Sequence, residues 1–163
     1  MSPPGSLERF RRAQDRTQAG FVDALGELRA SKKRSHWIWY VFPQLHGLGS
    51  SPAAAEYGLR GAEEAREYLA DPTLRERLLA VTRVVAEQLD HGVQVRDLMG
   101  SEIDALKLVS SLTLFEGVIR HLDSGEASPA AAELGELASA VLAEAERQGI
   151  PRCAFTRQRL WPV

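Results

Sequence analysis

Two stretches of the sequence carry polar side chains in patterns that suit ligand binding. The first places aromatic or imidazole groups at most positions between residues 36 and 42, namely His36, Trp37, Trp39, Tyr40 and Phe42. A segment that is aromatic on all sides is either a central core element or a wall on which a flat ligand stacks. In the first case its indole N–H groups bond to backbone carbonyls. In the second case His36 and Gln44 supply polar contacts.

The second stretch, Asp104–Phe115, has the pattern of an apolar helix that includes an ammonium group and a hydroxyl. At about 100° per residue, Lys107 and Ser111 fall within or beside the apolar face. A buried ammonium is costly unless it is paired or faces a cavity. Lys107 therefore reaches water along its stem, pairs with Asp104, or lines a polar cavity. Ser111 either donates to the carbonyl of Lys107 or lines the same cavity.

These observations lead to a hypothesis about function. Four cations between residues 29 and 34 precede the aromatic segment, and a cationic rim beside stacking surfaces suits a small anion. We expect the two stretches to pack around a pocket for a nucleotide or an ADP-ribose-like molecule. The candidate ligand-binding residues are Lys33, His36, Trp37, Trp39, Gln44, Lys107, Ser110 and Ser111. If a reaction is catalysed there, His36 would be the general acid or base and Lys107 the electrostatic stabiliser.

The alternative hypothesis is a non-enzymatic helical module that binds another protein. The exposed edge of the last long helix, or the segment Leu160–Pro162, would then be the contact surface. Trp161 is a suitable anchor because tryptophan is enriched at the energetic centres of interfaces. The opposite interpretation is that Trp161 docks on its own bundle.

Other chemistries lack their signatures. The four histidines are scattered without metal-ligand spacing, and Cys153 is the single cysteine. No GxSxG elbow or nucleotide-binding glycine loop is present, so neither a metal nor a cofactor is predicted and no catalytic residue is assigned. The 22 acidic and 20 basic residues give a net charge of −2, which argues against a broad nucleic-acid surface.

The elements that must position these residues are helices. Helix-start signals recur, with Ser51, Asp71, Ser101 and Ser128 as caps and with Ser6, Thr17 and Ser35 as further candidates. Residues 93–95 are the one hint of a strand. The 163-residue chain is therefore expected to be all-α, a compact irregular bundle of six to eight helices in a single domain. We divide it into a helical body at 6–124, an added helix at 125–149 packed on it, and a tail at 150–163.

The cellular setting follows from absent segments. No stretch has the apolar length of a signal peptide or a membrane span, so a cytoplasmic location is expected, and the free thiol suits a reducing compartment. The oligomeric state is not encoded in any pattern that we recognise.

A resemblance to a known family rests on the same two stretches. The string Lys33–Leu45, the residues Gly47–Ser50 after it, and Asp104–Phe115 together resemble the family of domains of unknown function 1810. These are small bacterial proteins with a mainly helical fold. The resemblance covers residues 6–122 and implies a helical, single-domain body, without an activity. After His121 the chain departs from the family pattern, with an Ala- and Glu-rich helix and a tail in place of a further aromatic segment.

Overall fold

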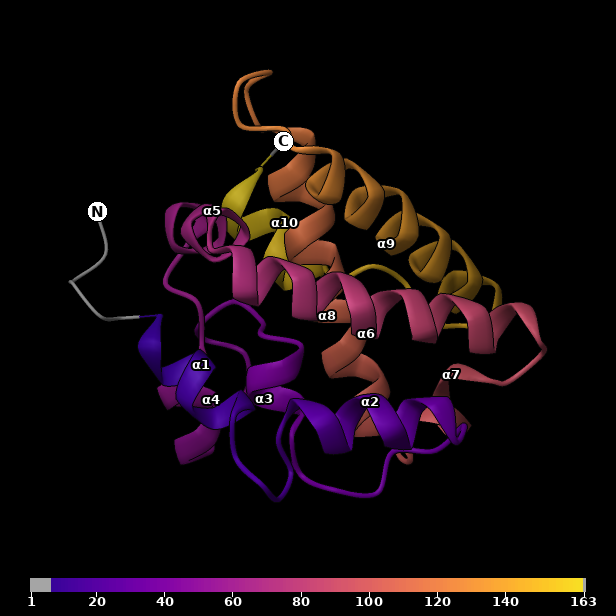
Figure 1. Cartoon of the computed structure of the whole chain (residues 1–163). Helices are drawn as coiled ribbons and strands as arrows, with labels where there is room; N and C mark the ends of the chain where they lie inside the picture. Colours follow the sequence, from indigo (N-terminus) through magenta and orange to yellow (C-terminus); the bar gives the residue numbers. More distant parts are fainter. Residues whose placement is uncertain (1–6, 163) are drawn as a thin grey trace.

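The computed structural model describes residues 7–162, and within them the chain forms ten helices joined by short loops (Figure 1). They are α1 (Glu8–Gln14), α2 (Phe21–Arg29), α3 (Ile38–Val41), α4 (Pro52–Tyr57), α5 (Ala62–Ala70), α6 (Pro72–Asp90), α7 (Val95–Met99), α8 (Glu102–Arg120), α9 (Pro129–Arg147) and α10 (Ala154–Leu160). The described residues contain no strand, and a single isolated bridge joins Leu45 to Leu59. The predicted all-α class is confirmed.

The structure has ten helices where six to eight were expected, because short helices were overlooked. Residues 93–95, the hint of a strand, lead into α7, which has five residues and ends at Gly100 with a φ of 82°. The segment 150–163, predicted as a tail, contains α10. A helix of five to seven residues spans at most two turns, so its sequence has too few positions to reveal a period.

Four predicted caps are present. The side chains of Ser51, Asp71, Ser101 and Ser128 each accept a hydrogen bond from the backbone N–H three residues later. Thr17 and Ser35 were wrong as caps, since Gly20 precedes α2 and Trp37 precedes α3. Ser6 lies outside the described residues. A cap works where its side chain has no better partner, and Ser35 bonds to Glu27 instead.

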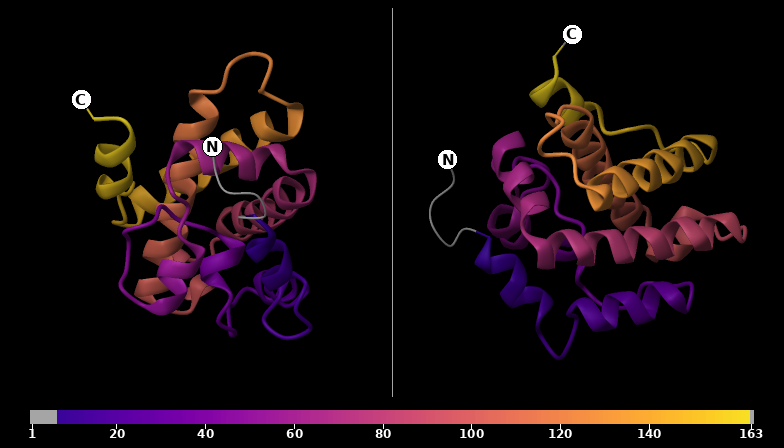
Figure 2. Two further views of the ribbon diagram at one scale, coloured as in Figure 1. Left: turned by 90° about the vertical axis from the view of Figure 1, so that its left-hand side faces the viewer. Right: turned by 45° about the horizontal axis from the view of Figure 1, so that its top comes forward.

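Helix α8 is the centre of the bundle. All of its residues from Leu108 to Val118 are buried. Helix α9 packs along both α6 and α8, while α2 lies on the other side of α6 (Figures 1 and 2). One hydrophobic core extends from Phe10 in α1 to Ile150 beyond α9. Within residues 7–162, no helix combines the length and the apolar character that crossing a membrane requires.

Candidate ligand-binding site

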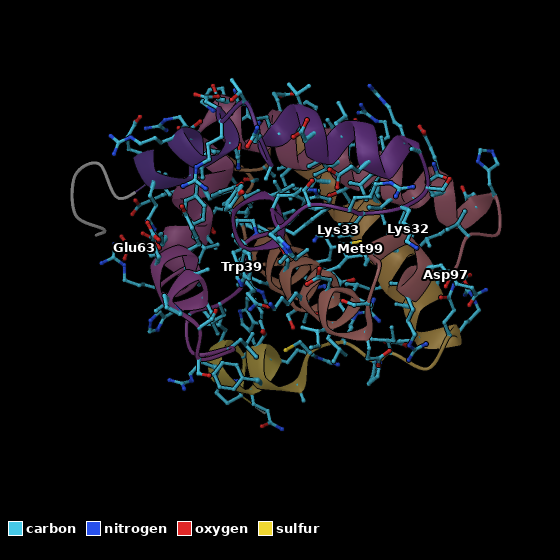
Figure 3. All side chains as sticks on the ribbon, turned by 90° about the horizontal axis from the view of Figure 1, so that it is seen from below. Lys32, Lys33, Trp39, Glu63, Asp97 and Met99 are labelled. Carbon is cyan, nitrogen blue, oxygen red and sulfur yellow. The ribbon has the colours of Figure 1, made fainter. Side chains whose placement is uncertain are left out.

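Lys33, the first predicted site residue, belongs to the scaffold. Its side chain is only 5% exposed, and its Nζ lies 2.8 Å from Oδ2 of Asp104 at the start of α8. The ammonium also donates to the carbonyl of Ser35 and lies 5.0 Å from the centre of the Trp37 ring. The backbone N–H of Lys33 donates to Leu98 at the end of α7. Figure 3 accordingly shows Lys33 near Met99, with Trp39 further along the molecule.

Glu27 organises the loop that carries Lys33 and Trp37. Its carboxylate accepts hydrogen bonds from the backbone of Arg34, from the backbone and hydroxyl of Ser35, and from Nε1 of Trp37. Burial alone would raise the pKa of this carboxyl, but the hydrogen bonds from Ser35, Arg34 and Trp37 outweigh burial and lower the pKa to about 2. Trp37 is fully buried, so here the indole is part of the core and its N–H is satisfied.

Three other predicted residues are dispersed. His36 is exposed. Gln44 is buried, and its Nε2 donates to the carbonyl of Leu48 at 3.5 Å within its own loop. Ser110 is 8% exposed on α8. A binding role for these three residues stays a prediction.

Two of the remaining predicted residues, Trp39 of α3 and Lys107 of α8, are in contact, and the third, Ser111, lies further along α8. Nζ of Lys107 lies 4.7 Å from the centre of the Trp39 ring, and Ser111 follows Lys107 by one helical turn on the same face. Of the alternatives left open for Lys107, pairing with Asp104 is not formed, because Asp104 binds Lys33. Of those left open for Ser111, the bond to the carbonyl of Lys107 is not formed, since its Oγ has no partner in the described structure.

A pocket of about 720 Å³ lies elsewhere, between the C-terminal half of α8 and α10. Five of its lining residues belong to α8 or directly follow it, and the rest come from the last eleven described residues. They are Thr113, Glu116, Gly117, Arg120, His121, Arg152, Ala154, Arg157, Gln158, Trp161 and Pro162. None of the eight predicted site residues is among them, although Thr113 belongs to the predicted helix string.

An ion-pair cluster attaches the chain before α10 to α8. Arg152 donates from Nε and Nη2 to the two carboxylate oxygens of Glu116, both at 2.9 Å, and from Nη1 to Glu146. Ser139 of α9 donates to the same Glu116 carboxylate at 2.7 Å. Burial would raise the pKa of Glu116, but the bonds from Arg152 and Ser139 outweigh it and lower the pKa. The same carboxylate bond, opposed by burial, raises the pKa of Arg152, so both groups stay charged.

A stacked aromatic pair forms the other end of the pocket. The ring of Trp161 is parallel to His121, with centres 5.2 Å apart, and Nδ1 of His121 lies 2.7 Å from the carbonyl of Gly117. A Cβ on Gly117 would collide with ring atoms Cη2 and Cζ3 of Trp161. The absence of a side chain at Gly117 therefore lets the indole lie on α8, and Trp161 docks on its own bundle.

The charge of the pocket is positive. Its lining includes three arginines, Arg120, Arg152 and Arg157, and one acidic residue, Glu116. Arg152 already neutralises this carboxylate, and Nη2 of Arg120 lies 3.9 Å from it. Arg157 is exposed and has no ion pair among residues 7–162. An anion that enters the pocket would thus meet two guanidinium groups with little competition.

Comparisons with known proteins agree with this fold and name no activity. The family model described as "Protein of unknown function (DUF1810)" matches residues 4–127. The crystal structure of the conserved hypothetical protein Rv1873 from Mycobacterium tuberculosis is similar, with 37% sequence identity and a TM-score of 0.75. The similarity covers 97% of this chain and 98% of that chain. No curated protein gives a significant match.

Proposed function

Because the chain belongs to the DUF1810 family, whose description names no activity, we propose from the geometry that the protein binds a small phosphorylated molecule in the pocket between α8 and α10. The observation that supports this proposal is the convergence of Arg120, Arg152 and Arg157 on a 720 Å³ space with a single carboxylate. The anionic ligand class is the one expected from the sequence. Helix α8 is one wall of the pocket, as in the hypothesis from the sequence, but the other wall is α10 and not the aromatic segment.

The size and the chemistry of the pocket suit such a ligand. Pockets for small molecules have volumes of roughly 300–1,000 Å³, with a few polar groups that fix orientation. The planar guanidinium fork matches the oxygen geometry of phosphate. The indole of Trp161 and the imidazole of His121 add flat surface at one end, which favours a ligand with a ring attached to its phosphate, as in a nucleotide or an ADP-ribose-like molecule.

The experiment measures binding to the full-length protein by isothermal titration calorimetry. The probes are AMP, ADP-ribose, ribose 5-phosphate and inorganic phosphate. At least one organic phosphate is expected to bind more tightly than inorganic phosphate. Arg157→Gln should weaken that binding about tenfold, because a hydrogen bond to a charged group contributes about 1.5–3 kcal/mol.

A matched control is available on the same helix. Arg159 stacks over Phe155, with its guanidinium carbon 5.1 Å from the ring centre, and does not line the pocket. Arg159→Gln removes the same charge from α10 and should leave binding within about twofold. If the two substitutions weaken binding equally, binding depends on the overall charge of the protein and not on the pocket, and the pocket proposal fails.

The second candidate function, a helical protein-interaction module, draws on a different surface. Ile103 and Leu106 at the start of α8 are 64% and 47% exposed. By contrast, the tail segment first considered as a contact is partly buried, with Leu160 and Trp161 packed against the core. Leu106→Glu would abolish complex formation with a protein partner but would leave phosphate binding at α10 unchanged. A cytoplasmic location remains part of either proposal and is tested by cell fractionation.

A further inference from the structure

Two unpaired buried polar atoms belong to residues of α3 and α8, two helices that are in contact. These are Nε1 of Trp39 and Oγ of Ser111, and neither has a hydrogen-bond partner in the described structure. Ser111 is fully buried. A buried donor without an acceptor costs roughly 1–3 kcal/mol, so native proteins keep few of them. Two such atoms in one small region therefore require an explanation.

Lys107 adds a third donor at the same place. Its ammonium lies over the Trp39 ring, and no carboxylate pairs with it among residues 7–162. The nearest acid on its own helix face, Asp104, binds Lys33 on the other side. Lys107 and Ser111 are one helical turn apart, so their side chains are neighbours. Helices α3 and α8 thus present an ammonium, an indole N–H and a hydroxyl, none of which has an acceptor among residues 7–162.

From this juxtaposition we propose that Trp39, Lys107 and Ser111 form a second anion site that binds a carboxylate group. This site is distinct from the α8–α10 pocket. A carboxylate offers two oxygens with about four acceptor positions, enough for all three donors. Trp39 and Lys107 are each half-buried, and rotation of the flexible lysine side chain opens the way to the indole N–H. By contrast, the side chains of Lys33 and Trp37 have acceptors in Asp104 and Glu27.

The experiment follows the indole N–H directly. The chain has three tryptophans, so a ¹H–¹⁵N spectrum shows three indole signals, and Trp39→Phe assigns one of them. Titration with sodium acetate, against sodium chloride at equal ionic strength, should shift the Trp39 signal downfield as its N–H gains a charged acceptor. The Trp37 signal should stay fixed because that N–H already donates to Glu27. A Trp39 signal that responds equally to chloride would overturn the proposal.

Substitutions give an independent test. Lys107→Gln and Ser111→Ala should each weaken the acetate response about fivefold or more, while Ser111→Ala leaves the acetate-free protein as stable as the wild type or more stable. Thr82→Val is the matched control, since Thr82 in α6 has a similarly buried and unpaired hydroxyl. It should stabilise the fold without changing the acetate response. If Ser111→Ala behaves like Thr82→Val in both measurements, the unpaired hydroxyl is not a ligand group.

Each of the two sites contains its own tryptophan, whose indole signal reports binding at that site. Trp161 lines the α8–α10 pocket and Trp39 lies at the α3–α8 contact. Arg157→Gln should move the phosphate-dependent shift of Trp161 to about tenfold higher phosphate concentrations, while the acetate-dependent shift of Trp39 stays unchanged. Failure of one site therefore does not count for or against the other.

Discussion

The ammonium of Lys33 binds the carboxylate of Asp104 across 71 positions of sequence, at 2.8 Å between Nζ and Oδ2. This pair joins the loop before α3 to the first turn of α8. Because Asp104 binds Lys33, Lys33 is a structural anchor, and Lys107 has no carboxylate partner among residues 7–162. The loop and the helix that carry the family resemblance are thus connected by charge as well as by packing.

Loss of this pair should destabilise the fold. Asp104→Asn removes the negative charge and leaves a 5%-exposed ammonium with only neutral acceptors, the new amide oxygen and the Ser35 carbonyl. We expect the free energy of unfolding to fall by about 3 kcal/mol, as for other broken buried pairs, measured by urea denaturation. Asp97→Asn, at an exposed position in α7, should change it by less than about 0.5 kcal/mol. Similar losses in both variants would contradict the structural role of the pair.

Glu27 should give the protein a pH-dependent stability at acidic pH. Its pKa is about 2 in the folded protein against a usual value of 4.5. The stabilisation is therefore fully present above pH 4.5 and is lost as the pH falls from 4.5 towards 2. Glu27→Gln should lower the unfolding free energy by about 2 kcal/mol at pH 7, through weaker hydrogen bonds. Urea unfolding from pH 7 to 3 should show a smaller loss in this variant. An unchanged slope would assign the acid sensitivity to other carboxyl groups.

Gly117 should control the position of the pocket wall. A methyl group at Gly117 collides with the indole of Trp161, so Gly117→Ala should displace α10 and weaken organic-phosphate binding about tenfold or more. The helix itself gains up to about 1 kcal/mol from alanine, so the thermal midpoint should change little. Calorimetry and the Trp161 indole signal measure the effect. Gly117→Ala in a Trp161→Ala background should bring no further loss of binding.

Two adjacent residues before α2 should respond to substitution with opposite signs. Ala19 has a φ of 55°, a left-handed conformation that costs an alanine about 1 kcal/mol or more. Ala19→Gly should therefore raise stability by about 0.5 kcal/mol after the entropy of the unfolded chain is counted. Gly20→Ala should lower stability by about 2–3 kcal/mol, because its Cβ would run into the carbonyl oxygen of Arg16. Thermal unfolding of the two variants measures the sign of each change in stability. Equal shifts of the two midpoints would contradict the predicted opposite effects.

Local patterns predicted most of the helices because their causes are local. The four cap residues that precede α4, α6, α8 and α9 form hydrogen bonds within three residues of themselves. Apolar periodicity identified the long helices for the same reason. Caps failed where a side chain found a distant partner, as Ser35 did with Glu27. The all-α class therefore follows from the sequence, while the short helices do not.

The candidate sites were less predictable because they depend on long-range pairing. Three of the eight predicted residues, Trp39, Lys107 and Ser111, lie on two helices that are in contact, and their unpaired atoms are visible only in three dimensions. The α8–α10 pocket was missed entirely. Two of its three arginines, Arg152 and Arg157, lie in a segment taken for a tail, and Arg152 meets Glu116 across 36 positions. The sequence analysis singled out Trp161, but no sequence pattern indicates that its ring packs against Gly117 and His121.

Helix α9 completes the hydrophobic core, although it lies beyond the residues that the family model matches. The match to the family model ends at residue 127, two residues before α9 starts, whereas the similarity to Rv1873 covers 97% of this chain. Yet Leu134, Ala138, Val141, Leu142 and Ala145 are at most 1% exposed and seal α6 and α8. A polypeptide that ended where the match to the family model ends would leave the apolar faces of α6 and α8 open to water. The end of the match is therefore not a folding boundary of this chain.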